Sequence, residues 1–102
     1  MRPEYVRVAH VSDIADRRAK RLQVGGEEIV LWRVEDRFYA VKNSCPHQHV
    51  PALHEGTLTG TNLTCPMHGW TFSLETGLSQ TGDGRATIYE VRVEGEDVFI
   101  GL

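Results

Sequence analysis

Both ends of the chain alternate apolar and polar residues with a period of two, which is typical of half-buried β-strands. The runs YVRVAH (residues 5–10) and TIYEVRVE (residues 87–94) show this alternation clearly. Turn signals separate the other strand-like runs, among them Gly25-Gly26 and Glu35-Asp36, and so predict β-hairpins. Further strands are expected at 20–24, 27–34, 37–43 and 98–100, and one short helical turn capped by Ser12 or Asp13.

Residues 43–85 follow a different pattern. They are rich in Gly, Pro, Thr and Ser, and their strand-like runs (residues 63–66 and 70–73) are only four residues long. A segment with so few continuous apolar runs cannot build much core of its own. We therefore expect an all-β chain forming one domain, residues 1–102. Its outer β-domain is made from both ends of the chain, and residues 43 to about 85 form a small inserted unit.

Composition narrows the class of protein. The 102 residues carry a formal net charge of -3, which lacks the basic excess of a nucleic-acid binder. No run resembles a secretory signal or a membrane span, so a cytoplasmic, unanchored protein is expected. Residues 1–42 hold nine Lys/Arg against seven Asp/Glu, and residues 43–102 hold two against seven. The inserted unit therefore lies in the acidic part of the chain, which could face a basic partner.

Two short motifs carry the candidate chemistry. Cys45-x-His47 and, after 17 intervening residues, Cys65-x-x-His68 place one cysteine and one histidine in each of two loops. In a reducing compartment such cysteines are metal ligands more often than disulfides. One zinc ion could use all four side chains, although structural zinc sites usually pair like with like. The mixed pairing suits a two-iron centre better, with both cysteines on one iron and both histidines on the other.

This pattern resembles the Rieske iron–sulfur proteins, in which two histidines replace two cysteines on one iron of a [2Fe–2S] centre. The runs NSCPHQHVPALHEGTL (residues 43–58) and CPMHGWTFSLETG (residues 65–77) resemble their first and second cluster loops. The resemblance implies the Rieske fold, a barrel-like or sandwich-like antiparallel β base with a cluster-binding subdomain at about 43–85. It also implies one [2Fe–2S] cluster per chain, bound by the four ligands Cys45, His47, Cys65 and His68.

The same resemblance indicates the redox range. Two neutral imidazoles leave the oxidised cluster formally uncharged, so it accepts an electron more easily than a four-cysteine cluster, at about -150 to +300 mV. High-potential relatives add a disulfide and hydroxyl groups near the cluster sulfurs. This chain has no third cysteine, and Trp70 and Phe72 stand at the hydroxyl positions. We expect the low-potential end, with Thr71 as the one candidate hydroxyl donor.

A Rieske ferredoxin passes one electron at a time and is not itself an enzyme. The resemblance implies a monomer that accepts electrons from a flavoprotein reductase and passes them to a terminal oxygenase of the ring-hydroxylating type. No membrane or nucleic acid takes part. One alternative is the small subunit of an NAD(P)H nitrite reductase, in which the acceptor is a reductase, and another is a zinc-binding structural module. Metal content and copurification would separate these readings.

Overall fold

The computed structural model describes residues 4–43, 55–66, 71–79 and 85–101, which form nine β-strands and one short 3₁₀ helix. The 3₁₀ helix η1 covers Val11–Asp13. The strands are β1 (Tyr5–His10), β2 (Ala19–Val24), β3 (Glu27–Val34), β4 (Arg37–Lys42), β5 (Thr57–Thr59), β6 (Asn62–Thr64), β7 (Thr71–Ser73), β8 (Ile88–Glu94) and β9 (Asp97–Gly101). Within the described residues, no helix is long and apolar enough to cross a membrane.

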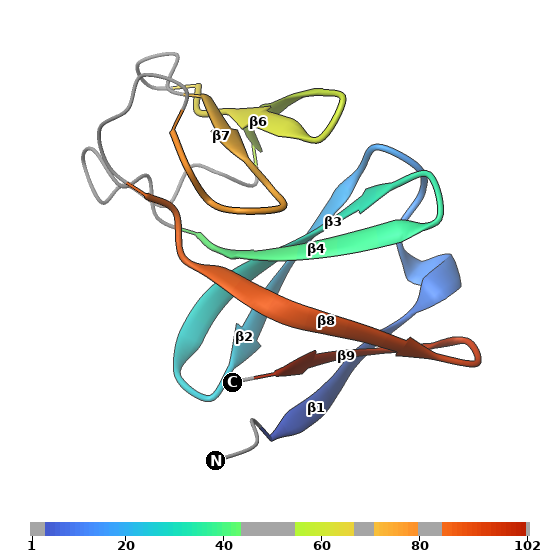
Figure 1. Cartoon of the computed structure of the whole chain (residues 1–102). Helices are drawn as coiled ribbons and strands as arrows, with labels where there is room; N and C mark the ends of the chain where they lie inside the picture. The colour runs from blue at the N-terminus through green and yellow to red at the C-terminus, as the bar shows by residue number, and fades with distance from the viewer. Residues whose placement is uncertain (1–3, 44–54, 67–70, 80–84, 102) are drawn as a thin grey trace.

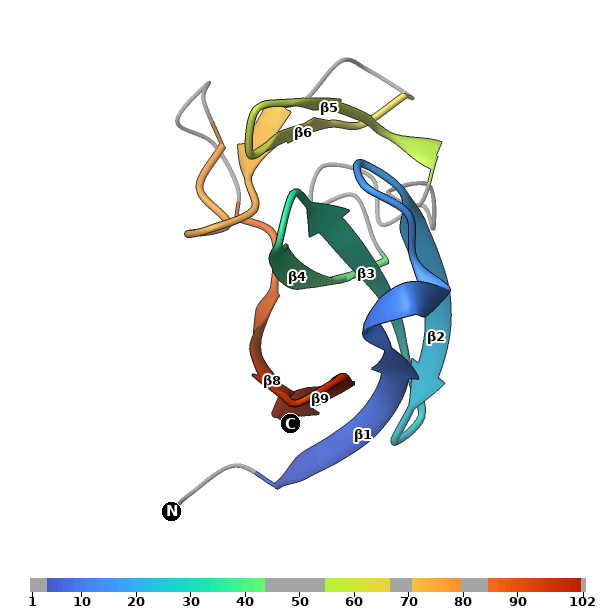
Figure 2. The same ribbon diagram turned by 90° about the vertical axis from the view of Figure 1, so that its right-hand side faces the viewer.

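Six of the strands form an antiparallel sheet in the order β1-β9-β8-β4-β3-β2. The two outermost strands, β1 and β2, come close to each other, so that the sheet curls into a nearly closed barrel (Figures 1 and 2). Gly25 and Gly26 form the β2–β3 turn with φ of 58° and 83°, a left-handed conformation that glycine adopts without strain. The predicted all-β architecture with a barrel-like base is therefore confirmed.

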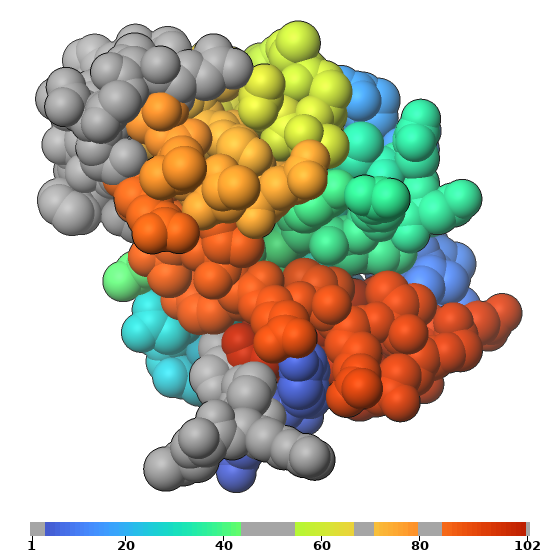
Figure 3. Space-filling model, viewed as in Figure 1, coloured from blue at the N-terminus to red at the C-terminus, as the bar shows by residue number. Residues whose placement is uncertain are grey.

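The remaining strands, β5, β6 and β7, form a second antiparallel sheet of three short strands. They lie between β4 and β8 in the sequence, and in space they cover one face of the barrel (Figures 1 and 3). The run predicted at 63–66 corresponds to β6, which begins one residue earlier and ends two residues earlier. The run predicted at 70–73 corresponds to β7, and its first residue lies outside the described part of the chain. The sequence did not predict β5, because three residues are too few to show a period.

Strand β3 contributes side chains to two hydrophobic clusters, because it is buried on both faces. Ile29 and Leu31 point into the barrel, while Val30 and Trp32 point outward beneath the small sheet. All four side chains are at most 5% exposed. The outward pair packs in one apolar cluster whose other buried members are Val41, Leu63, Cys65, Phe72, Leu74 and Ala86. The small sheet and the barrel therefore share one core, to which both contribute side chains.

The start of η1 differs from the sequence-based prediction of a cap at Ser12 or Asp13. His10 is the N-cap, and its Nδ1 accepts a hydrogen bond from the Ser12 N–H at 3.1 Å. Asp13 closes the capping box from the other side, since its carboxylate accepts from the His10 N–H at 2.9 Å. His10 also contacts Glu96 through Nε2, at 3.0 Å. This last contact ties η1 to the β8–β9 turn, and no local sequence pattern encodes it.

Candidate metal centre

Of the four predicted ligands, Cys65 lies within the described part of the chain. Cys45, His47 and His68 lie outside it, as do Met67 and Trp70, so the four-ligand arrangement stays a prediction. Cys65 directly follows β6 and its side chain is 0% exposed. It belongs to the apolar cluster between the barrel and the small sheet. The second ligand motif therefore begins at the buried interface of the two sheets.

The surroundings of Cys65 fit an iron–sulfur ligand. A thiolate is a soft ligand, and a dry apolar shell around it keeps water from a bound cluster and influences the cluster's potential. Leu63 and Phe72, each 1% exposed, lie on the same face of the small sheet as this cysteine. The cysteine thus occupies the kind of low-dielectric environment in which a sulfur-bound metal centre is protected from hydrolysis.

The chain just before the first predicted ligand motif is held by hydrogen bonds. Asn43, the last described residue before the first motif, is 3% exposed, and its N–H donates to the Glu28 carbonyl at 2.9 Å. Its neighbour Lys42 donates its N–H to the Thr87 carbonyl, also at 2.9 Å. The chain therefore leaves β4 from a point fixed on both sides, which limits where the first ligand motif can begin.

Across the second motif, Thr64 and Thr71 stand directly opposite each other on β6 and β7. Their Oγ1 atoms are 2.8 Å apart, a normal O–H···O hydrogen bond, and both residues are partly buried. Sequence analysis offered Thr71 as a hydroxyl donor to a cluster sulfur. In the structure this hydroxyl is engaged with Thr64, whose neighbours Leu63 and Cys65 face the opposite side of the sheet.

A side-chain tether also links the small sheet to the barrel. Arg17 donates from Nη2 to the Leu58 carbonyl at 3.1 Å, and from its backbone N–H to the Arg33 carbonyl at 2.8 Å. Its φ of 61° lies in the left-handed region, which a non-glycine residue adopts only when its surroundings enforce it. Arg17 thus holds β5 against the β2–β3 side of the barrel, a role that the sequence did not indicate.

One buried donor in this region has no partner among the described residues. The Trp32 indole N–H is fully enclosed, and no described acceptor lies within hydrogen-bonding distance. Trp32 lines a pocket of about 500 Å³ together with Arg17, Arg18 and residues 55–58. The indole nitrogen itself is shielded from that pocket, because its exposed area is below 1 Å². The pocket is therefore lined by two arginines, and the indole nitrogen is not exposed in it.

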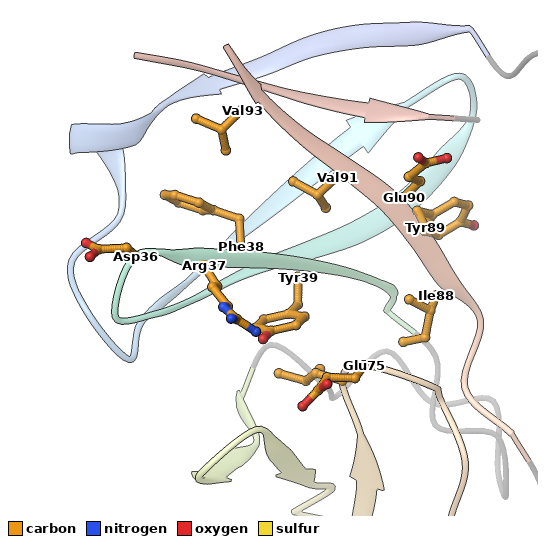
Figure 4. A pocket seen from close by; sticks show the side chains of 11 residues that line it. Asp36, Arg37, Phe38, Tyr39, Glu75, Ile88, Tyr89, Glu90, Val91 and Val93 are labelled. Carbon is orange, nitrogen blue, oxygen red and sulfur yellow. The ribbon is translucent and has the colours of Figure 1, made fainter. Parts of the chain in front are cut away.

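A groove of about 510 Å³ opens between β4 and β8 (Figure 4). Strand β8 pairs with β4 only at Ile88 and Tyr89 and then turns to pair with β9, so the two strands diverge. Phe38 from β4 and Val91 from β8 line the groove that this divergence leaves (Figure 4). Burial raises the pKa of Tyr89 above its usual value of 10.0, and the nearby Glu27 carboxylate adds to this shift. Cys65, the predicted ligand that the structure describes, does not line this groove.

The fold and site define a class of small all-β proteins, in which a nearly closed antiparallel barrel carries a three-stranded sheet over a buried cysteine. Comparison with known proteins identifies the family within that class. The family model described as the Rieske [2Fe-2S] domain matches residues 4–98. The chain therefore belongs to the Rieske [2Fe–2S] domain family, and a [2Fe–2S] cluster is its cofactor, as the sequence resemblance implied.

Individual relatives agree with this assignment. The ferredoxin component of the alkene monooxygenase system of Xanthobacter autotrophicus is 40% identical over 103 residues, covering 96% of this chain and 81% of the relative. The ferredoxin in a complex of reduced oxygenase and oxidized ferredoxin of carbazole 1,9a-dioxygenase is 31% identical. Its TM-score is 0.84, with 95% of this chain and 92% of that chain covered. The predicted Rieske-type electron carrier is thus confirmed.

The fold also occurs in proteins of another kind. A structure described as the small subunit of an NADH-dependent nitrite reductase from Mycobacterium tuberculosis superimposes with a TM-score of 0.91, covering 98% of this chain and 96% of that chain. Its sequence identity is only 17%. This likeness therefore shows a shared fold and does not bear on the partners of the present chain.

Proposed function

We propose that the chain is the ferredoxin component of a multicomponent oxygenase, accepting electrons from a flavoprotein reductase and delivering them to a terminal oxygenase. The observation that carries this proposal is the match along nearly the full length of stand-alone ferredoxin components. The low identity to the nitrite reductase subunit gives no comparable support for the alternative acceptor. The chain carries one electron per cycle and works as a monomer.

We further propose that Cys45 and Cys65 bind one iron and His47 and His68 bind the other. The buried position of Cys65 supports the assignment of the cysteines to the inner iron, since this thiol already lies in the dry interface of the two sheets. Histidines on the outer iron would give an electron a short exit toward a partner. Residues 43 to about 85 then act as the cluster-binding subdomain of a single domain.

When bound, the [2Fe–2S] centre supplies one-electron redox chemistry. The residues of this chain set how easily the electron is accepted. The apolar shell of Leu63, Phe72 and Leu74 excludes water and disfavours extra negative charge, and Thr71 has its hydroxyl engaged with Thr64. Fewer hydrogen bonds to sulfur leave the reduced state less stabilised. We therefore expect a potential in the lower half of the range of about -150 to +300 mV.

The ligand assignment is tested by spectroscopy on anaerobically purified protein. The wild type should contain two irons per chain and give an EPR signal only after reduction, with an average g below the free-electron value. C65S and H68A should lose this signal, whereas H10A should keep it, because His10 caps η1 and lies outside the motifs. A wild type holding one zinc and no iron would contradict the proposal.

The choice of partner is tested by reconstitution. Purified holoprotein is mixed with the reductase and oxygenase components of an alkene monooxygenase system, and NADH-driven alkene oxidation is measured with and without it. Stimulation that depends on the holoprotein and is absent with C65S supports the oxygenase pathway. If the holoprotein shows its EPR signal and is reduced by the reductase but never stimulates turnover, the oxygenase assignment is wrong.

A further inference from the structure

The hydrogen bond between Thr64 and Thr71 occupies a special place in the small sheet. Thr64 is the last residue of β6 and Thr71 is the first residue of β7, so their rung closes the connection formed by residues 65–70. That connection contains two of the proposed ligands, Cys65 and His68. The distance between the two threonines therefore sets how far apart the two ends of this ligand loop lie.

The described pairing of β6 with β7 is short. Strands β6 and β7 pair through three rungs only, and the rung of Thr64 and Thr71 is the terminal one. Terminal rungs of short ladders open most readily, because fewer neighbouring contacts must break with them. The adjacent rung, Leu63 with Phe72, is anchored by burial on the barrel side of the sheet. The terminal rung has its two hydroxyls on the other side, 2.8 Å apart.

We propose that Thr64 and Thr71 are positioning residues, which fix the width of the second ligand loop and so retain the cluster in a single geometry. The inference rests on the proposed ligands Cys65 and His68. Successive side chains on a strand face opposite ways, so Thr64 is directed away from the Cys65 side of the sheet. The pair acts through the backbone of the loop ends and contributes no direct ligand.

The proposal predicts that the hydroxyls, rather than the shape of the side chains, retain the cluster. Valine has nearly the shape of threonine without the hydroxyl, so T64V and T71V remove the hydrogen bond and leave packing almost intact. Losing one such bond should increase the population in which this rung is open about 5-fold and speed cluster loss to a chelator by the same factor. The double variant should lose it no faster than either single one, because the same bond is removed.

The experiment uses the cluster-loaded full chain under anaerobic conditions, with an iron chelator in excess and visible absorbance as the readout. T64S and T71S keep the hydroxyl and should release the cluster at the wild-type rate. T59V is the matched control, because Thr59 is an exposed threonine of the same sheet that faces Asn62. A second readout is the EPR spectrum of the reduced protein, whose lines should broaden in the valine variants as the loop geometry becomes less uniform.

Two results would overturn the inference. The first is valine variants that release the cluster at the wild-type rate with unchanged EPR lines. The second is serine variants that lose the cluster as fast as the valine ones, which would assign the effect to the methyl groups. A wild type without the reduced-state signal, or a C65S variant that keeps it, would instead refute the ligand assignment itself. The same set of proteins therefore distinguishes a failure of the threonine proposal from a failure of the ligand assignment.

Discussion

Gly77 occupies a position that no other residue type can fill without distorting the structure, and G77A tests the packing between the small sheet and the barrel. Its φ is +80°, and its N–H donates to the Ser73 carbonyl at 2.7 Å. A Cβ added there would lie 2.4 Å from the carbonyl oxygen of Ala86 and 3.0 Å from Cγ1 of Ile88. The first distance is far inside van der Waals contact, and the atom it meets belongs to the backbone.

Two costs follow from this geometry. An L-residue in the left-handed region costs about 1–2 kcal/mol. Moving Ala86 away adds about 1–3 kcal/mol, as for other overpacked sites, because its N–H donates to the Gly77 carbonyl at 2.8 Å and its side chain is buried. The total, about 2–5 kcal/mol, is a large part of the 5–15 kcal/mol that stabilises a typical domain.

The matched control is G60A. Gly60 also has a positive φ, +63°, but no atom lies within 4 Å of the added Cβ. It should carry only the conformational cost, and the reduced entropy of the unfolded chain cancels between the two variants. Urea unfolding followed by tryptophan fluorescence should therefore find G77A less stable than G60A by about 1–3 kcal/mol. Equal stabilities would refute the reasoning, since they would mean that Ala86 yields without cost.

Three further predictions address other contacts. R17Q removes the side-chain bond to the Leu58 carbonyl, so amide exchange in β5 should become about 5-fold faster while β1 is unchanged. F72A deletes a side chain that is 1% exposed, and should lower the free energy of urea unfolding by about 3–5 kcal/mol. The hydrogen bond from the His10 N–H lowers the pKa of Asp13 below 3.8. Asp13 therefore adds stability above pH 3.8 that is lost as the pH falls below it, and D13N should converge with the wild type in acid denaturation.

The barrel was predictable because its strands obey local rules. The period of two, the Gly25-Gly26 turn and the Glu35-Asp36 turn each depend on a few neighbouring residues. Strand β5 could not be predicted, because its three residues form a strand only when β6 lies beside them. The role of His10 was missed for a related reason, since its partners include Glu96, which is distant in sequence.

The chemistry of the candidate site could be predicted from the sequence, whereas the contacts around it could not. The spacing of cysteines and histidines predicts a two-iron centre, because such a centre needs thiolate and imidazole ligands from two loops. The family confirms the cluster, whereas the four ligand positions stay a prediction. The burial of Cys65, the pairing of Thr71 with Thr64 and the tether from Arg17 depend on which segments meet across the fold. Such contacts are set by tertiary packing, which a pattern of single residues does not record.

Successive side chains of strand β3 pack into two different hydrophobic clusters. Ile29 and Leu31 fix the interior of the barrel, while Val30 and Trp32 form the floor on which Cys65 and the small sheet rest. The environment of the redox centre can therefore change by substitution at alternate positions of one strand, with the interior of the barrel left intact. Substitutions at Val30 or Trp32 would therefore adjust the driving force for electron transfer while the scaffold stays the same.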